Sequence, residues 1–313
     1  MSASVRVLNF DQSVTQQHAF LSRFQPEIVD LTPLGPSARI WVSRATANAI
    51  RRVLHPGSRA AVTLIGSGDF HHVSSLLIEQ FREPISVIVF DHHPDWDILP
   101  PKLHCGSWVT QVLKQPNVKH VILFGVSSND LSSPRIHSGN LGSLTQDRLE
   151  IYPYRHEPTT VMLRRVPVNR SCRVVNHFGF STITWTELSR QPLQEFVRGV
   201  LERLEVKQVY VSIDKDCLQA GASLTNWEAG FLSLDALLQM LRLMRQCTEV
   251  VGADLVGDYS PPKIRGWLKT MIAKFDYPND YSARGKSADE ICRVNEATNL
   301  KLVEFLTTTH PAA

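Results

Sequence analysis

The segment at residues 85–97, which reads ISVIVFDHHPDWD, constrains the fold of this chain more than any other stretch. Its first six residues are almost all apolar, and such a run is typical of a strand that is buried on both faces of a sheet. Aspartate and histidine dominate the residues that follow, and in an extended chain Asp91, His93 and Asp95 would point to the same side. Because carboxylates held close together repel one another, a cation is expected between them. The segment therefore predicts a buried strand that ends at a metal site.

Apolar runs of strand length alternate with segments of helical periodicity along most of the chain. We expect strands at residues 5–10, 60–65, 85–90, 118–126, 149–154, 206–213 and 250–256, and helices at residues 45–54, 72–81, 106–113, 184–204, 234–244 and 289–306. Ser43 and Ser233 are expected N-caps, and Thr184 and Glu187 have the spacing of a capping box. This alternation predicts an α/β fold with three layers, in which a doubly wound, mostly parallel sheet carries helices on both faces.

Three regions give weaker signals. Residues 1–58 are assigned only in part, residues 155–183 offer short extended pieces without a clear period, and residues 261–286 read as a long polar loop before the C-terminal helix. No linker-like stretch divides the 313 residues, so we expect one α/β domain that spans residues 1–313.

Composition argues against several classes of protein. Hydrophobic residues make up 43% and charged residues 20% of the chain, as in a globular protein, and no apolar run is long enough to span a membrane. The first residues lack the apolar core of a signal peptide, so we expect a cytoplasmic protein. A formal charge of +3 gives no reason to expect nucleic acid as a partner. The five cysteines are odd in number and widely spaced, which indicates reduced thiols.

Three of the expected strands end in residue types that bind metals. The sequence GSGDFHH follows the strand at 60–65, DHHPD follows the strand at 85–90, and DKD follows the strand at 206–213. The carboxyl ends of parallel strands lie at one edge of a sheet, where α/β proteins bind their ligands. Oxygen-rich sites with one imidazole per ion suit manganese better than zinc. The carboxylates outnumber what one ion needs, so we expect a pair of ions that activates water for hydrolysis.

These three motifs, in this order, resemble those of the arginase–agmatinase (ureohydrolase) superfamily. The resemblance covers residues 60–260 and implies an arginase-like fold with two Mn²⁺ ions per chain. The implied ligands are Asp91 and Asp214 as bridges between the ions, His71 and Asp95 on one ion, and His93 and Asp216 on the other. Phe70 separates the aspartate of the first motif from its histidines, which leaves His72 as the alternative to His71.

The family also has a histidine, downstream of its Asp-x-His-x-Asp motif, that gives a proton to the leaving amine. The segment KLHCGS resembles a shortened version of that region, which implies that its histidine, His104, is the general acid; an imidazole suits this role because its pKa lies near neutrality. The glutamate with which family members bind a guanidinium is missing, and Gly257 stands at its position. Asp258 or Glu228 is expected to replace it, with Trp227 as a wall of the substrate pocket.

Three other residues lie next to the proposed ligands. Lys215 stands between two of them, and strand alternation predicts that it points away from the ions, toward the outer side of the carboxylates or solvent. Cys105 and Cys217 raise the alternative of a thiolate nucleophile, although buried, unreactive cysteines are far more common.

The motifs and the resemblance imply a binuclear manganese hydrolase that cleaves a C–N bond of a guanidino or amidino group. A hydroxide that bridges the ions would attack, with Asp91 and His104 as catalytic residues. The expected substrate is a small molecule or peptide with a guanidino, amidino or amide group, and the resemblance also implies a homo-oligomer. One alternative is a mononuclear zinc amidohydrolase related to deacetylases. The other, which Gly257 favours, is a catalytically silent relative that binds a metal or a metabolite.

Overall fold

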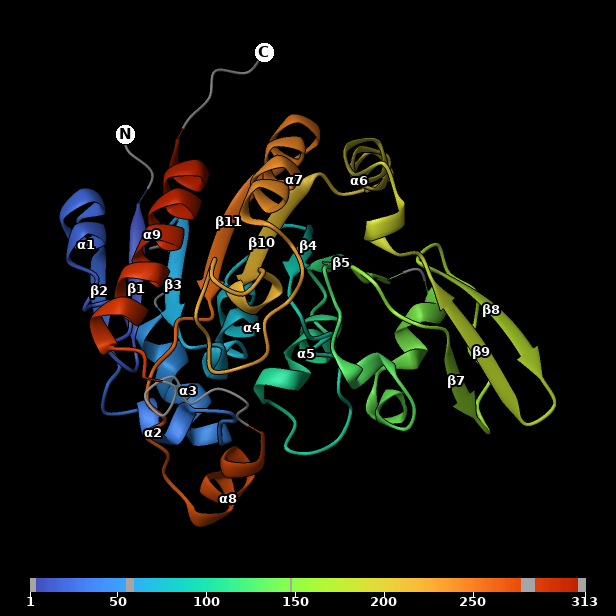
Figure 1. The fold of residues 1–313 in the computed structure, drawn as a ribbon, viewed down its shortest axis with the longest axis horizontal. Coiled ribbons are helices and arrows are strands. Elements are labelled where there is room, and N and C mark those ends of the chain that lie inside the picture. Colours follow the sequence, from blue (N-terminus) through green and yellow to red (C-terminus); the bar gives the residue numbers. More distant parts are fainter. Residues whose placement is uncertain (1–3, 55–58, 147, 277–284, 309–313) are drawn as a thin grey trace.

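Eight strands form the central sheet of this computed structural model, which describes residues 4–54, 59–146, 148–276 and 285–308. Their order across the sheet is β2-β1-β3-β11-β10-β4-β5-β6, and every neighbouring pair is parallel (Figure 1). The strands are β1 (Val5–Asn9), β2 (Glu27–Asp30), β3 (Val62–Gly66), β4 (Ile85–Phe90), β5 (Val118–Phe124), β6 (Leu149–Tyr152), β10 (Gln208–Asp214) and β11 (Glu249–Val256). The prediction of a doubly wound, mostly parallel sheet is confirmed.

Side chains alternate between the faces of this sheet and build a hydrophobic core on each of them. In β4, Val87 and Val89 belong to the core on one face, whereas Ile88 and Phe90 belong to the core on the other. All four are fully buried, and burial of such a side chain contributes about 1.5–3 kcal/mol to folding. Burial on both faces explains why the strand is a continuous apolar run in the sequence.

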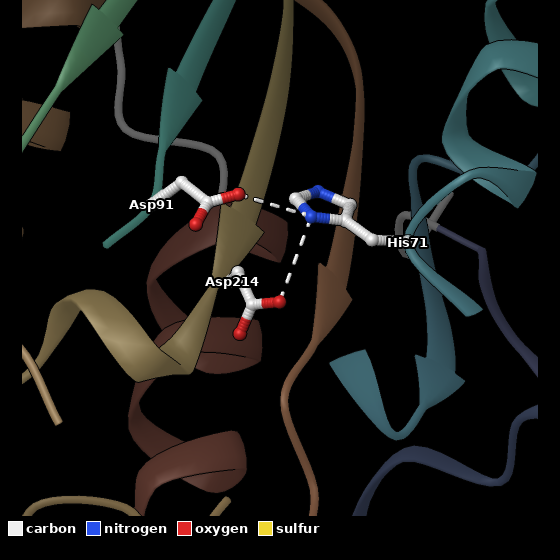
Figure 2. Close-up of side chains that lie close together, drawn as sticks. All are labelled: His71, Asp91 and Asp214. Atoms are coloured by element: carbon white, nitrogen blue, oxygen red, sulfur yellow. Dashed lines mark ion pairs between the residues drawn. The ribbon is translucent and has the colours of Figure 1, made fainter. Parts of the chain in front are cut away.

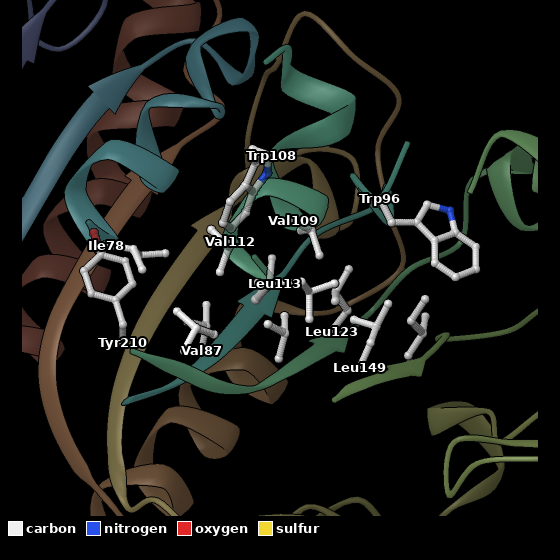
Figure 3. Close-up of a cluster of buried hydrophobic side chains, with 14 of the residues drawn as sticks. Ile78, Val87, Trp96, Trp108, Val109, Val112, Leu113, Leu123, Leu149 and Tyr210 are labelled. Carbon is white, nitrogen blue, oxygen red and sulfur yellow. The ribbon is translucent and has the colours of Figure 1, made fainter. Parts of the chain in front are cut away.

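Helices cover both faces of the sheet, as predicted (Figure 1). On one face lie α3 (Arg44–Val53), α4 (Val73–Ile78) and α5 (Trp108–Val112), and Figure 3 shows part of the core beneath them. On the other lie α1 (His18–Phe24), α6 (Leu193–Glu202), α7 (Leu234–Cys247) and α9 (Ala288–Thr307). Ser43 and Ser233 cap α3 and α7 through their hydroxyl groups, as predicted. Among the described residues, no helix has both the length and the apolar character that crossing a bilayer requires.

A second sheet, which the sequence did not predict, consists of β7 (Thr159–Met162), β9 (Phe180–Trp185) and β8 (Cys172–His177) in that order. Its strands are antiparallel and project at the end of the molecule farthest from β2 (Figure 1). One face is exposed, with Met162 59% and Val175 45% accessible. Because this face mixes apolar and polar residues, the hydrophobic alternation that reveals a half-buried strand is weak here.

The predicted helix at 184–204 was wrong over its first half. Residues up to Trp185 complete β9, and α6 begins only at Leu193, after Pro192. Thr184 lies in the strand, so it forms no capping box with Glu187. β-Branched and aromatic residues before position 186 favour a strand, and this preference outweighs the apolar spacing that suggested a longer helix.

Two regions that the sequence left open contain further helices. A short helix, α2 (Gly35–Ala38), precedes α3 in the N-terminal part. Helix α8 (Trp267–Asp276) lies within residues 261–286, so the prediction of a loop was wrong for this part. The portion of that prediction at residues 277–284 lies outside the described residues.

Candidate metal centre

The carboxyl ends of β3, β10 and β4 lie close together at one edge of the central sheet. A 3₁₀ turn at Gly68–Phe70 follows β3 and leads to His71. A second 3₁₀ turn at Lys215–Cys217 follows β10, and the Asp214 carboxylate accepts a hydrogen bond from its backbone. After β4 the chain leaves the sheet, and Asp95 adopts a positive φ of 45°. These turns direct the residues of all three motifs toward one point.

His71, Asp91 and Asp214 form the first of two His/Asp groups at this edge (Figure 2). The Nδ1 atom of His71 lies 3.1 Å from Asp91 Oδ2 and 3.5 Å from Asp214 Oδ2. Asp95 approaches the same nitrogen, with its Oδ2 atom 3.2 Å away. All four side chains are buried, and three carboxylate oxygens converge on one imidazole nitrogen.

The second group consists of Asp91, His93 and Asp216. The Nδ1 atom of His93 lies 3.0 Å from Asp216 Oδ2 and 3.7 Å from Asp91 Oδ1. The two oxygens of Asp91 therefore face different groups, so this carboxylate would be shared by two ions if both were bound. The structure places Asp214, the other expected bridge, with His71.

Hydrogen bonds behind His71 leave its Nδ1 atom free to bind a cation. His71 Nε2 lies 2.9 Å from Ser212 Oγ, and this hydroxyl donates to Asp254 Oδ1 at 2.8 Å. Because the hydroxyl proton goes to Asp254, Nε2 must be the donor to Ser212, so Nδ1 carries a lone pair whenever the ring is neutral, as it is when it binds a metal. Within the described part of the chain, His71 Nδ1 and Asp91 Oδ2 are buried atoms without hydrogen-bond partners. Two buried ligand-type atoms that face each other at 3.1 Å without a well-formed hydrogen bond fit the donor set of a metal ion.

The charges of this centre also fit a divalent cation. Burial, with the charge of Asp91 adding to it, raises the pKa of Asp95 to about 7 and the pKa of Asp216 to about 6. Burial opposes protonation of His71, but Asp91 and Asp95 outweigh it and raise its pKa well above the ordinary value. Without a metal, the centre therefore retains protons that a divalent ion would displace.

A cavity of about 630 Å³ opens onto both groups. Its volume falls within the range of roughly 300–1,000 Å³ of small-molecule sites. Trp227 and Glu228, which the sequence predicts as substrate-binding residues, line it. The Oε2 atom of Glu228 lies 3.4 Å from His93 Nε2, and this interaction lowers the pKa of Glu228 to about 2. Glu228 is thus a carboxylate at the mouth of the cavity.

His104, the expected general acid, lines the same cavity. Burial lowers its pKa to about 4, so the imidazole is neutral near pH 7. A neutral imidazole accepts a proton before it can give one. The role of proton donor therefore requires that His104 first takes a proton from another group in the cavity.

Comparison with known proteins supports a common origin for these motifs. The sequence profile of the Arginase family matches residues 25–273. The chain belongs to the arginase family. An uncharacterised protein of Thermotoga maritima is 26% identical to it over 204 residues, which are 65% of this chain; the chain spans 60% of the length of that curated relative.

Solved structures share the fold of this arginase-family chain. The arginase of Bacillus subtilis is 13% identical, with 99% of each chain covered and a TM-score of 0.58. The proclavaminate amidino hydrolase of Streptomyces clavuligerus is 14% identical, with 95% of this chain and 93% of that chain covered and a TM-score of 0.53. The formimidoylglutamase of Bacillus subtilis is 13% identical, with 96% of this chain and 87% of that chain covered and a TM-score of 0.50. At these identities the likeness is one of fold.

Gly257 stands where the sequence resemblance places the guanidinium-binding glutamate, and the backbone there accepts no side chain. Its φ is +92°, which favours glycine. A Cβ atom at this position would overlap Asp214 Oδ1 and lie 2.8 Å from the backbone nitrogen of Lys215. The position that the resemblance assigns to the glutamate is therefore held by a glycine whose backbone lies close to a candidate ligand.

Asp258, one of the two residues expected to replace that glutamate, does not line the cavity. It is buried outside the cavity, where its Oδ2 atom lies 2.9 Å from Lys215 Nζ. Lys215 is fully buried rather than directed to solvent, and it also donates to Asn299 Oδ1 at 2.8 Å. His72, the alternative to His71, is fully buried and belongs to neither His/Asp group.

Several contacts that hold the site in place were not predicted from the sequence. Asp69 forms an ion pair with Arg39 and accepts a hydrogen bond from Trp227 Nε1 at 3.1 Å. Trp108 Nε1 donates to Asp95 Oδ2 at 2.6 Å. These contacts fix a wall of the cavity and a ligand, but their partners are ordinary residue types without a motif.

The two cysteines near the motifs lie in surroundings that disfavour a thiolate nucleophile. Cys105 lines the cavity, and burial raises the pKa of its thiol well above the ordinary value. Burial has the same effect on Cys217, which is fully buried. Because the thiolate is the reactive form, both side chains are held in the unreactive state.

Proposed function

We propose that this chain is a hydrolase with two metal ions that cleaves a C–N bond of a guanidino or amidino group in a small molecule. The observation that carries the proposal is the pair of His/Asp groups that share Asp91 at the floor of a cavity. One ion would lie among His71, Asp91, Asp95 and Asp214. The other would lie among Asp91, His93 and Asp216.

We assign manganese to this site because of its donor atoms. Each group offers one imidazole and otherwise carboxylates, and neither contains a thiolate. Such oxygen-rich donor sets suit Mn²⁺. When bound, the two ions supply a nucleophile from water at neutral pH and stabilise the charge that develops in the transition state.

The cavity favours a cationic substrate group. Asp97, Asp130 and Glu228 place carboxylates along its lining, whereas Arg135 is paired with Asp130 at 3.4 Å. An excess of negative charge attracts a guanidinium or amidinium ion, and the face of Trp227 can stack against it. The names of two fold neighbours, an amidino hydrolase and a formimidoylglutamase, refer to substrates with related groups. We therefore assign recognition of the planar cation to Glu228 and Trp227.

During turnover His104 would move a proton, and Glu228 would bind the substrate as a carboxylate. His104, neutral at pH 7, accepts the proton that the attacking water loses and then delivers it to the leaving nitrogen. Glu228 receives the cationic end of the substrate and, through its contact with His93, also orients a candidate ligand. Asp91 belongs to both groups and would be shared by the two ions.

Metal content and product release test this proposal together. The full chain, purified with Mn²⁺, should contain two manganese ions by elemental analysis and release urea, ammonia or an amine from at least one of arginine, agmatine, guanidinobutyrate and arginine-containing peptides. His93→Ala should lower both the metal content and the rate. Lys301→Gln, an exposed change on α9, is the control and should alter neither.

Three other results would contradict the proposal in different ways. One zinc ion per chain with amide hydrolysis would indicate a mononuclear amidohydrolase. Two ions without turnover of any guanidino or amidino compound would indicate a silent metal-binding relative. A chain that takes up no divalent metal would remove the basis for either kind of hydrolysis.

A further inference from the structure

A second cavity, of about 910 Å³, lies on the edge of the sheet opposite the metal centre. Ser86 and Val118 line it where β4 and β5 begin, and Val206 lines it just before β10. The metal centre lies at the other ends of β4 and β10. Among the described residues, the two cavities have no lining residue in common.

Positive charge is concentrated in this second cavity. Five of its lining residues are Lys114, Lys119, Arg148, Arg170 and Arg203, whereas Glu205 is the one acid among those that the structure describes. The whole chain carries a formal charge of only +3, so this cavity gathers more positive charge than the molecule has overall. A concave surface lined by charges of one sign raises the local concentration of ions of the opposite sign.

Two of these cations are bonded to neutral groups of the protein. Lys119 Nζ donates to the carbonyl oxygen of Pro116 at 2.9 Å. A guanidinium nitrogen of Arg148 donates to the carbonyl oxygen of Val118 at 2.7 Å. Carbonyl groups hold these side chains in place without cancelling their charge. An anion would therefore find positioned donors whose charge is available for charge-assisted hydrogen bonds.

The floor of the cavity is polar and fixed. The Oε1 atom of Gln115 is buried and has no hydrogen-bond partner in the described part of the chain. Thr110, which also lines the cavity, donates to the carbonyl oxygen of Trp96 at 2.7 Å. Arg203 is partly neutralised by Glu150, whose Oε2 atom lies 3.9 Å away. The remaining cations and the unpartnered amide form a site that exists before any ligand arrives, as most small-molecule sites do.

We propose that this cavity binds a small polyanion that carries two or more phosphate or carboxylate groups. Several cations around one hollow match a ligand with more than one negative group, and the planar fork of Arg148 or Arg170 suits the paired oxygens of either chemistry. The volume limits the ligand to a small molecule. The site is independent of the hydrolysis proposed for the metal centre.

Titration calorimetry on the full chain tests this proposal with inorganic pyrophosphate and citrate as phosphate and carboxylate probes. We expect at least one of them to bind, with an affinity that falls as salt is added. Lys114→Gln, Lys119→Gln and Arg170→Gln, combined in one variant, remove three exposed charges from the lining. This variant should bind the probe roughly tenfold or more weakly, because each lost contact is a charge-assisted one.

Two matched variants distinguish binding in this cavity from binding elsewhere on the chain. Arg44→Gln, Arg242→Gln and Lys301→Gln, combined, change the net charge equally at exposed positions outside the cavity and should leave the affinity unchanged. Asp91→Asn alters the metal centre, where both probes could bind through metal ions. This variant should also leave the affinity for the probe unchanged. If neither probe binds, the proposal is overturned. The proposal would also be overturned if both triple variants lost the same amount of probe affinity. The same holds if Asp91→Asn lost probe affinity and the cavity variant did not.

Discussion

His71 reaches the candidate metal centre with one ring nitrogen and the interior of the sheet with the other. Its Nε2 atom contacts Ser212 Oγ, which donates to Asp254. Asp254 also accepts hydrogen bonds from Ser74 Oγ and from the hydroxyl of Tyr210, at 3.0 Å and 2.7 Å. This buried network fixes the tautomer of His71 and therefore the availability of the Nδ1 lone pair.

Ser212→Ala should weaken metal binding by roughly 10- to 100-fold, because His71 loses the partner that sets its tautomer and ring orientation. Metal titration of the variant measures the effect. Ser86→Ala is the control: this buried serine in β4 donates to the carbonyl oxygen of Val206, at the far end of the sheet. The control should lose a comparable hydrogen bond without losing metal affinity. Equal affinities in the two variants would show that Ser212 does not act through His71.

Gly257→Ala should be more destabilising than a positive φ alone explains. Forcing an L-residue into this region costs about 1–2 kcal/mol, and the overlap of the new Cβ with Asp214 should add about 1–3 kcal/mol. Gly179→Ala is the matched control, since Gly179 has a φ of +82° with nothing within 4 Å of its Cβ position. Urea unfolding of both variants gives the difference. If the two substitutions cost the same, Gly257 does not crowd Asp214.

The candidate ligands were predictable from the sequence, and the residues that hold them were not. Aspartate and histidine at the ends of apolar runs are unusual enough to mark a site, and the sheet geometry explains why they converge. The choice of His71 over His72 depended on the turn at Gly68–Phe70, which the sequence did not fix. Ser212 and Asp254 are common residue types. They lie 42 residues apart in the sequence, so only the folded chain reveals their contact.

At the scale of elements, a buried ion pair joins four segments behind the metal centre. Lys215, in the turn after β10, pairs with Asp258, which follows β11. Asn299 of α9 contacts both side chains, and Gln17 before α1 donates to Asp258 Oδ1 at 2.8 Å. Because these groups are fully buried, each charge depends on its partners for solvation.

Lys215→Met should therefore cost roughly 3–5 kcal/mol, since it leaves Asp258 as an uncompensated buried charge. The double variant Lys215→Met with Asp258→Asn should be more stable than the single one, because it removes that charge. Urea unfolding measures both. If the double variant is no more stable than Lys215→Met, the cost of Lys215→Met does not come from the uncompensated charge of Asp258. Under the proposed hydrolase function, a folded Asp258→Asn variant should keep the KM for substrate, as expected of a residue outside the cavity.

Elements buried on both faces were easier to predict than those with one exposed face. The strands β4, β5 and β10 are continuous apolar runs because helices cover them on both sides. The strands β7, β8 and β9 have a solvated face, and local residue preferences there compete with hydrophobic spacing. The same competition misplaced the start of α6, where Pro192 marks a boundary that the apolar spacing of residues 193–204 hid.

At the scale of the whole molecule, the central sheet separates two sites of opposite charge. Carboxylates gather at the carboxyl ends of β4 and β10, and lysines and arginines gather near the amino ends of the same strands. Neither cluster is favourable by itself, because like charges repel one another. A bound cation at one edge and a bound anion at the other would each relieve that repulsion.

Removal of metal should lower the stability of the whole fold. The candidate ligands come from positions 71, 91–95 and 214–216, so the unfolded chain does not bring them together, and a metal that binds the folded state stabilises it by mass action. At a free Mn²⁺ concentration of 100 times the Kd, the free energy of unfolding should exceed that of the chelator-treated protein by about 2.7 kcal/mol. Urea unfolding with and without Mn²⁺ measures this difference, and Asp216→Asn should reduce it. An unfolding midpoint that does not respond to Mn²⁺ would show that these six side chains do not form a metal centre.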